Sequence, residues 1–199
     1  MYPLFETLCL LDGEIQHAEW HERRFVRFYL REFGQQPSYS LLDGLKIPKE
    51  FQKGKNRLRI RYHAQGTLAE FEPYHPAPLN RLRLIEAPQL DYSLKWTDRS
   101  ALNQLKEQKG EADDVLILQK GFIRDTSYCN VVFFDGKDWL TPATPLLEGT
   151  ARARLIAEGK IKPRELTLSD LPKMQGFRLV NALREFEEEE TRGMENLVF

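Results

Sequence analysis

The sequence predicts a mixed α/β fold (α+β) in two domains. Three observations predict it: short stretches of alternating apolar residues separated by turn dipeptides, longer stretches with helical periodicity, and a cluster of prolines between residues 73 and 89. A chain of 199 residues suits one domain or two small ones. The proline cluster divides it into a small N-terminal α/β domain, residues 1–88, and a larger C-terminal domain, residues 89–199.

The N-terminal domain begins with a predicted hairpin. Two short strands within residues 4–16 flank the turn dipeptide Asp12-Gly13. A helix is predicted over residues 21–33, and Gly34 ends it. Aromatic side chains recur in this helix at spacings of three and four residues, namely Phe25, Phe28, Tyr29 and Phe33.

The rest of the chain alternates between short strands, turns and helices. Alternation or short apolar runs predict strands over residues 57–62, 67–74, 82–85, 114–119, 122–126, 129–134 and 177–181. Turn dipeptides stand at Lys120-Gly121 and Asp135-Gly136. Helices are predicted over residues 39–42, 98–109 and 150–158, the second with Thr97 or Asp98 at its N-terminus.

Charge and cysteine content exclude several classes of protein. The 29 basic and 30 acidic side chains give a formal net charge of −1, which disfavours nucleic-acid binding. No apolar run reaches the roughly 18 residues of a membrane span, and residues 1–11 lack the features of a signal peptide. Cys9 and Cys129 cannot build a disulfide framework, and no cysteine or histidine spacing predicts a metal site. We therefore expect a cytoplasmic protein with no metal, nucleic-acid or membrane partner. The acidic run over residues 187–190 is expected to be solvated surface.

Two local patterns suggest chemistry. Lys95 lies between Leu94 and Trp96, and apolar surroundings favour the free amine that attacks a carbonyl, although such a lysine also fits the rim of a strand. Gly149-Thr150 opens a predicted helix, whose first N–H groups attract phosphate, although many ordinary helices begin in this way.

Five blocks of sequence occur in one order along the chain. They are Phe5-Glu6-Thr7, Asp12-Gly13, His21-x-x-Arg24-Phe25, the stretch from Gly121 to Phe133, and Leu140-Thr141-Pro142 followed by Leu146 to Arg152. This order resembles the class IV aminotransferases, the pyridoxal 5′-phosphate (PLP) enzymes of fold type IV that include the D-amino acid aminotransferase-like proteins. The resemblance implies a two-domain fold with PLP between the domains, a small-molecule amino substrate and a homodimer.

The resemblance also implies roles for individual residues. Lys95 matches the catalytic lysine that forms a Schiff base with PLP, and Arg24 matches the arginine that holds the PLP phosphate. Asp125 stands where the family usually has a glutamate that pairs with the pyridine nitrogen. The other positions that match cofactor-binding residues are Asn130, Leu147, Thr150, Ala151 and Asn181. The chain departs from many members at Ala151 and Ala182, where a threonine is common.

The same resemblance bears on the substrate and the reaction. Lys95-Trp96-Thr97-Asp98-Arg99 resembles the Lys-x-x-Asn-Arg spacing of 4-amino-4-deoxychorismate lyases. It implies substrate-binding roles for Arg99, for Phe5 and for Arg61, which matches a strand arginine that faces the substrate in several relatives; Arg61 also fits an exposed basic stripe on the strand. A 4-amino-4-deoxychorismate lyase-like activity is the expectation. An aminotransferase of the D-amino acid or branched-chain type and a non-catalytic relative are the alternatives.

Overall fold

The chain forms two compact units in the computed structural model, which describes residues 2–199. Unit 1 holds the residues up to Pro76 together with Leu94–Asp98, and unit 2 holds Ala77–Ser93 and Arg99–Phe199. The predicted boundary at residue 88 differs from this division. Residues 77–93 belong to unit 2 because Leu79 and Leu82 are buried in its core, and residues 94–98 return to unit 1.

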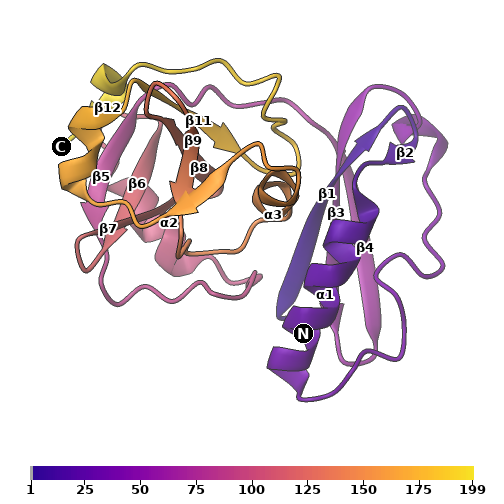
Figure 1. The fold of residues 1–199 in the computed structure, drawn as a ribbon. Coiled ribbons are helices and arrows are strands. Elements are labelled where there is room, and N and C mark those ends of the chain that lie inside the picture. The colour runs from indigo at the N-terminus through magenta and orange to yellow at the C-terminus, as the bar shows by residue number, and fades with distance from the viewer. Residues whose placement is uncertain (1) are drawn as a thin grey trace. The chain divides into compact units, whose positions relative to one another are not determined.

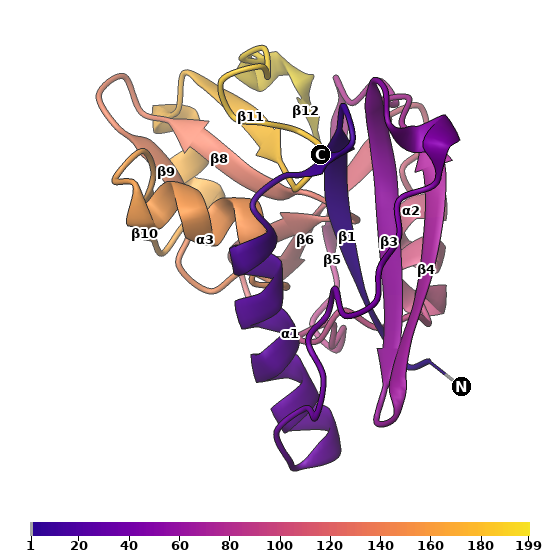
Figure 2. The same ribbon diagram turned by 90° about the vertical axis from the view of Figure 1, so that its right-hand side faces the viewer.

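Unit 1 is an antiparallel four-stranded sheet with one long helix along a face (Figures 1 and 2). The strand order is β2-β1-β3-β4. The elements are β1 (Leu4–Leu11), β2 (Glu14–Ile15), α1 (Ala18–Phe33), the 3₁₀ helix η1 (Lys49–Phe51), β3 (Lys55–His63) and β4 (Gly66–Pro73). Alternate residues of β3 are buried, so that Tyr62 meets Phe25 of α1 edge to face, with ring centroids 4.9 Å apart.

Local turn chemistry explains the elements of unit 1 that were predicted correctly. Asp12 and Gly13 both have positive φ, 47° and 82°, as the predicted tight hairpin turn requires. Gly34 ends α1 in the left-handed conformation, and its N–H donates to the carbonyl of Leu30. The helix begins at Ala18, three residues before the predicted start. The predicted helix over residues 39–42 is wrong: this segment makes a turn.

Unit 2 contains two four-stranded sheets and two helices. One sheet has the order β12-β5-β6-β7, and the other has the order β10-β9-β8-β11. The strands are β5 (Leu82–Glu86), β6 (Asp114–Gln119), β7 (Phe122–Thr126), β8 (Asn130–Phe134), β9 (Trp139–Pro142), β10 (Lys162–Arg164), β11 (Gly176–Val180) and β12 (Leu197–Val198). The helices are α2 (Ser100–Glu107) and α3 (Thr150–Ala157), with the 3₁₀ helices η2 (Leu168–Lys173) and η3 (Met194–Asn196). The second helix is shorter than predicted, and Arg99 rather than Thr97 or Asp98 precedes it.

The core of unit 2 is built from both sheets. Leu82 and Leu116 of one sheet and Val131, Phe133 and Leu179 of the other belong to the same buried cluster. A second cluster packs Leu155 of α3 against β8 and β11. Strand β7 leads into β8 through residues 127–129, so this core fixes the ends of the two strands.

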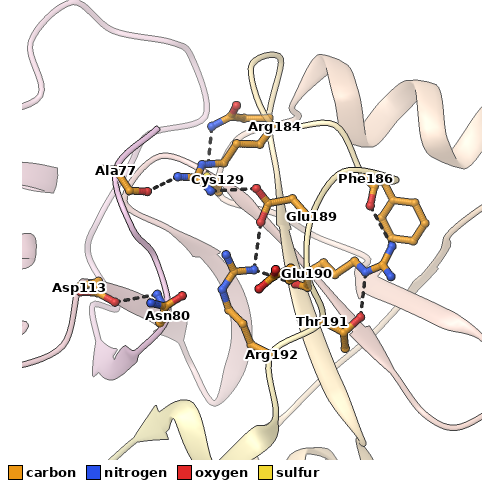
Figure 3. A network of polar contacts seen from close by, with 12 residues as sticks. Ala77, Asn80, Asp113, Cys129, Arg184, Phe186, Glu189, Glu190, Thr191 and Arg192 are labelled. Atoms are coloured by element: carbon orange, nitrogen blue, oxygen red, sulfur yellow. Dashed lines mark hydrogen bonds and ion pairs between the residues drawn. The ribbon is translucent and has the colours of Figure 1, made fainter. Parts of the chain in front are cut away.

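Part of the acidic run belongs to an ionic network of unit 2, in which Glu189 is largely shielded from solvent (Figure 3). Glu189 accepts from Arg184 Nη1 at 2.8 Å and from Arg192 Nη1 at 3.0 Å, and Arg184 Nη2 donates to the carbonyl of Ala77. The expectation of a solvated acidic surface is therefore wrong for Glu189. The network fastens the first residue of unit 2 to the loop after β11.

No helix in residues 2–199 is long and apolar enough to cross a bilayer.

Candidate active site

Lys95 lies beside the first residues of β1 in unit 1. Its carbonyl accepts a hydrogen bond of 3.1 Å from the N–H of Phe5, and Leu4 and Trp96 form an antiparallel bridge. The ammonium Nζ of Lys95 lies 4.8 Å from the ring centroid of Phe5. Unit 1 thus brings together the predicted catalytic lysine and one predicted substrate-binding residue, and the ring stabilises the ammonium through a cation–π interaction.

Arg24 belongs to a buried triad with Glu6 and His21. Arg24 Nε donates to Glu6 Oε1 at 2.8 Å, Arg24 Nη2 donates to Glu6 Oε2 at 2.5 Å, and His21 Nδ1 lies 2.7 Å from Glu6 Oε2. Because an ionised carboxylate only accepts, His21 Nδ1 carries the proton. The carboxylate therefore fixes the plane of the Arg24 guanidinium through two hydrogen bonds to its Nε and Nη2 atoms.

The charges of this triad are set by opposing effects. Burial raises the pKa of Glu6, but the Arg24 charge and the hydrogen bonds from His21 and Arg24 outweigh it and lower the pKa to about 2. Burial lowers the pKa of His21 below 6.5, against the opposing influence of Glu6. The triad at neutral pH is one carboxylate, one guanidinium and one neutral imidazole.

Glu6 is a site residue to which the sequence reasoning assigned no role. The signal that could have found it is its place in β1, where it shares the helix-covered face with the fully buried Leu4, Leu8 and Leu10. An acid at an inward position of an apolar strand needs a buried partner. His17 occupies the N-cap of α1, and the buried His21 packs in the first turns of the helix, bonded to Glu6.

Asp125 is the centre of the candidate site in unit 2. Its Oδ1 accepts from Asn130 Nδ2 at 2.8 Å, and its Oδ2 accepts from the N–H of Leu147 at 2.9 Å. Asn130 Nδ2 also donates to the carbonyl of Leu147 at 3.0 Å. Three residues predicted to bind the cofactor are thus joined in one buried network. Burial outweighs these bonds and the charge of Arg152, and raises the pKa of Asp125 to about 6.

The start of α3 is fitted against this network. Gly149 precedes the helix, and a Cβ at that position would lie 1.9 Å from Asn130 Oδ1. Thr150 and Ala151, both buried, form the first turn. Arg152 donates from Nη2 to the carbonyl of Pro142 at 2.7 Å and so ties the helix to β9. The first N–H groups of an α-helix have no partner within the helix and favour an anion.

Replacing Gly149 by alanine is expected to lower the free energy of unfolding by about 1–3 kcal/mol, because the new methyl group overlaps a hydrogen-bonded amide. Urea denaturation measures this loss. In an Asn130→Ala background the same substitution should cost clearly less, since the overlapping atom is gone. An equal cost in both backgrounds would show that Asn130 does not select glycine at this position.

Asn181 and Arg99 both have structural contacts in unit 2. Asn181 Nδ2 lies 3.1 Å from Cys129 Sγ, and its Oδ1 accepts from the N–H of Leu183 at 2.8 Å. Arg99 Nη2 donates to the carbonyl of Ser127 at 2.7 Å. Both side chains hold the segment between β7 and β8, and their roles toward cofactor and substrate stay predictions.

Arg61 lies on the face of the unit 1 sheet away from α1, where its Nη2 is 3.2 Å from Glu70 Oε2. Its substrate-binding role also stays a prediction.

Across residues 2–199, no three acidic, histidine or cysteine side chains gather as a metal site would require. Unit 1 therefore holds a lysine against the Phe5 ring and an arginine fixed by a carboxylate, and unit 2 holds a buried carboxylate beside a helix start.

Comparisons with known proteins place the whole chain in one family. The sequence model of the amino-transferase class IV family matches residues 3–186. An uncharacterized protein of Haemophilus influenzae is 35% identical over 185 residues, which are 92% of this chain and 98% of that protein. The relatives therefore include one that this chain matches over almost its whole length.

Solved structures agree with this assignment. A crystal structure of a candidate 4-amino-4-deoxychorismate lyase from Haemophilus somnus 129PT has a TM-score of 0.82 and 30% identity, covering 94% of this chain and 98% of that one. A candidate amino-acid aminotransferase from Mesorhizobium loti shares the fold, with a TM-score of 0.70 and 22% identity over 98% of this chain and 99% of that one. The chain belongs to the class IV aminotransferase family of PLP-dependent enzymes.

Proposed function

We propose that this chain binds PLP and acts on an amino substrate as a lyase of the 4-amino-4-deoxychorismate type. The observation that carries the cofactor assignment is the buried Asp125, whose raised pKa indicates a negative charge that its neighbours compensate only in part. A protonated pyridine nitrogen is a partner that this carboxylate suits. Ser127 follows Asp125 by two residues along the chain. Its hydroxyl is buried, has no hydrogen-bond partner among residues 2–199, and is therefore available to bond a bound cofactor.

The residues fit the other parts of the cofactor as well. We assign Lys95 to the aldehyde of PLP, Arg24 and the start of α3 to its phosphate, and Leu147 to its ring. When bound, PLP supplies a ring that accepts electrons from the substrate. The chain's own contribution is to orient the phosphate through Arg24, to keep the pyridine nitrogen protonated through Asp125, and to move a proton at the substrate carbon through the released Lys95 amine.

The assignment of Asp125 predicts a pH dependence of cofactor binding. As pH falls through about 6, Asp125 takes up a proton and the affinity for PLP should decline. Asp125→Asn should bind PLP about 10- to 100-fold more weakly at pH 8 and lack this decline, since a charged hydrogen bond contributes roughly 1.5–3 kcal/mol. Absorbance titration of cofactor-free protein with PLP between pH 5 and 8 measures both.

The same carboxylate also affects the cofactor-free protein. Because the folded state raises the pKa of Asp125, its contribution to stability is full below the unfolded value near 3.8 and is lost as pH rises through about 6. Asp113→Asn is the matched control for the loss of a carboxylate, because Asp113 is partly exposed and accepts hydrogen bonds from the backbone N–H groups of Asn80 and Arg81. Equal PLP affinity of wild type and Asp125→Asn at pH 8 would contradict the assignment.

The lyase assignment is supported by the similarity to the Haemophilus somnus protein and by the Lys95-to-Arg99 spacing. Product analysis tests it. A lyase releases pyruvate from 4-amino-4-deoxychorismate without an amino acceptor. An aminotransferase forms a 2-oxo acid from D-alanine or a branched-chain amino acid only when an acceptor is present. Dependence on an acceptor would overturn the lyase reading and leave the cofactor assignment intact.

We propose in addition that the protein is a cytoplasmic homodimer. Cys9 and Cys129 are both buried thiols, which suits a reducing compartment. Burial raises the pKa of the Cys129 thiol to about 12, so it is unreactive. Light scattering on the purified protein would measure the mass of the assembly, and a monomer across the micromolar range would overturn the dimer.

A further inference from the structure

Three arginines of β3 share the face of the unit 1 sheet that lies away from α1. Arg57, Arg59 and Arg61 alternate with buried residues, and Glu70 and Glu72 of the neighbouring strand β4 face them. Three cations therefore meet two acids. Side-chain geometry decides which guanidinium each carboxylate reaches.

The structure leaves Arg59 unpaired. Arg57 forms an ion pair with Glu72, and Arg61 pairs with Glu70 at 3.2 Å. Glu70 is the direct cross-strand neighbour of Arg59, yet its carboxylate is taken by Arg61. Within residues 2–199 no hydrogen bond or ion pair reaches the Arg59 guanidinium, and its Nε is buried without a partner.

The Arg59 and Lys95 side chains contact the same aromatic ring. Its Cζ atom lies 5.2 Å from the ring centroid of Phe5, and Lys95 Nζ lies 4.8 Å from the same centroid. The buried Phe5 ring thus makes a cation–π contact with both cations. Burial, and next to it the charge of Arg57, lower the pKa of Arg59, as expected for a guanidinium that lacks full compensation.

We propose that Arg59, rather than the ion-paired Arg61, binds the carboxylate of the substrate beside Lys95. The inference deepens the proposed function and rests on it. A guanidinium offers a planar fork of donors that matches a carboxylate, and a partly desolvated one gains most from an incoming anion.

Two pairs of probes test this by isothermal titration of the PLP-loaded protein. The first pair is 4-aminobenzoate and aniline, which lacks the carboxylate. The second pair is pyruvate and acetone, which has a methyl group in place of the carboxylate. Wild type should bind at least one carboxylate about 10- to 100-fold more tightly than its neutral counterpart, the range that a charged hydrogen bond supplies. Arg59→Gln should remove this preference and leave the neutral probe unaffected.

Matched variants separate charge from geometry and from folding. Arg57→Gln, on the same strand and face but ion-paired with Glu72, should keep the preference. Arg59→Lys keeps the charge without the fork and should fall between wild type and Arg59→Gln. Thermal unfolding of each variant checks that the sheet is intact.

Three results would overturn the proposal. They are a wild type that does not distinguish the members of either pair, an Arg59→Gln variant that keeps the preference, and a larger loss in Arg61→Gln than in Arg59→Gln. Failure of the proposed function gives a different signature, because a protein that takes up no PLP shows it in the absorbance spectrum before any probe is added. The titration is then run on the protein as purified, and its outcomes are judged in the same way.

Discussion

Replacing Lys95 by alanine is expected to lower turnover by at least about 10²- to 10⁴-fold, the contribution of a positioned acid–base group, and to abolish covalent attachment of PLP. The backbone of Lys95 is positioned by the bond from Phe5 N–H to its carbonyl, which does not depend on the side chain, whereas the substitution removes the contact of the amine with the Phe5 ring. The folded structure of Lys95→Ala should therefore persist while the chemistry is lost.

Borohydride reduction followed by intact-mass measurement checks the covalent attachment directly. Wild type should gain the mass of one reduced cofactor per chain, and Lys95→Ala should gain none. Lys106→Ala is the matched control, because Lys106 Nζ also lies over an aromatic ring, 5.0 Å from the centroid of Tyr128. A cofactor attached to Lys95→Ala would show that another lysine carries the reaction.

Turns and amphipathic stretches could be predicted from sequence because their determinants are local. Asp12-Gly13 and Lys120-Gly121 each place two residues at positive φ, a conformation that few residue pairs adopt. The strands β6 and β7 have the predicted bounds. The strands β9, β10 and β12 were missed because they have four, three and two residues and are too short for periodicity to reveal.

The unpredicted features depend on contacts between distant segments. The return of Lys95 to unit 1 rests on an antiparallel bridge between Leu4 and Trp96, which no local pattern indicates. The choice between Arg59 and Arg61 is similar, since both lie on one face of β3 and only the position of the Glu70 carboxylate separates them. The resemblance to a family indicates the strand on which a substrate-binding arginine is expected. The ion pair between Arg61 and Glu70 is what distinguishes Arg61 from Arg59 on that strand.

Glu6→Gln is expected to lower the free energy of unfolding by about 3–5 kcal/mol at pH 7, because it removes the buried carboxylate that forms an ion pair with the buried Arg24 guanidinium. The pH dependence follows from the lowered pKa of Glu6. Its stabilisation is full above the ordinary value near 4.5 and is lost as pH falls toward about 2. The difference between wild type and Glu6→Gln should therefore narrow with falling pH over this interval.

Urea denaturation between pH 3 and 8 measures this difference, and Glu72→Gln is the control. Glu72 pairs with Arg57 on the exposed face of the same sheet, so its replacement should cost only about 0–1 kcal/mol. If both variants lost the same small amount, the buried triad would not fix Arg24, and the phosphate role proposed for Arg24 would lose its structural basis. A large loss confined to Glu6→Gln would instead mean that unit 1 maintains a buried charge pair in order to hold that guanidinium in one orientation.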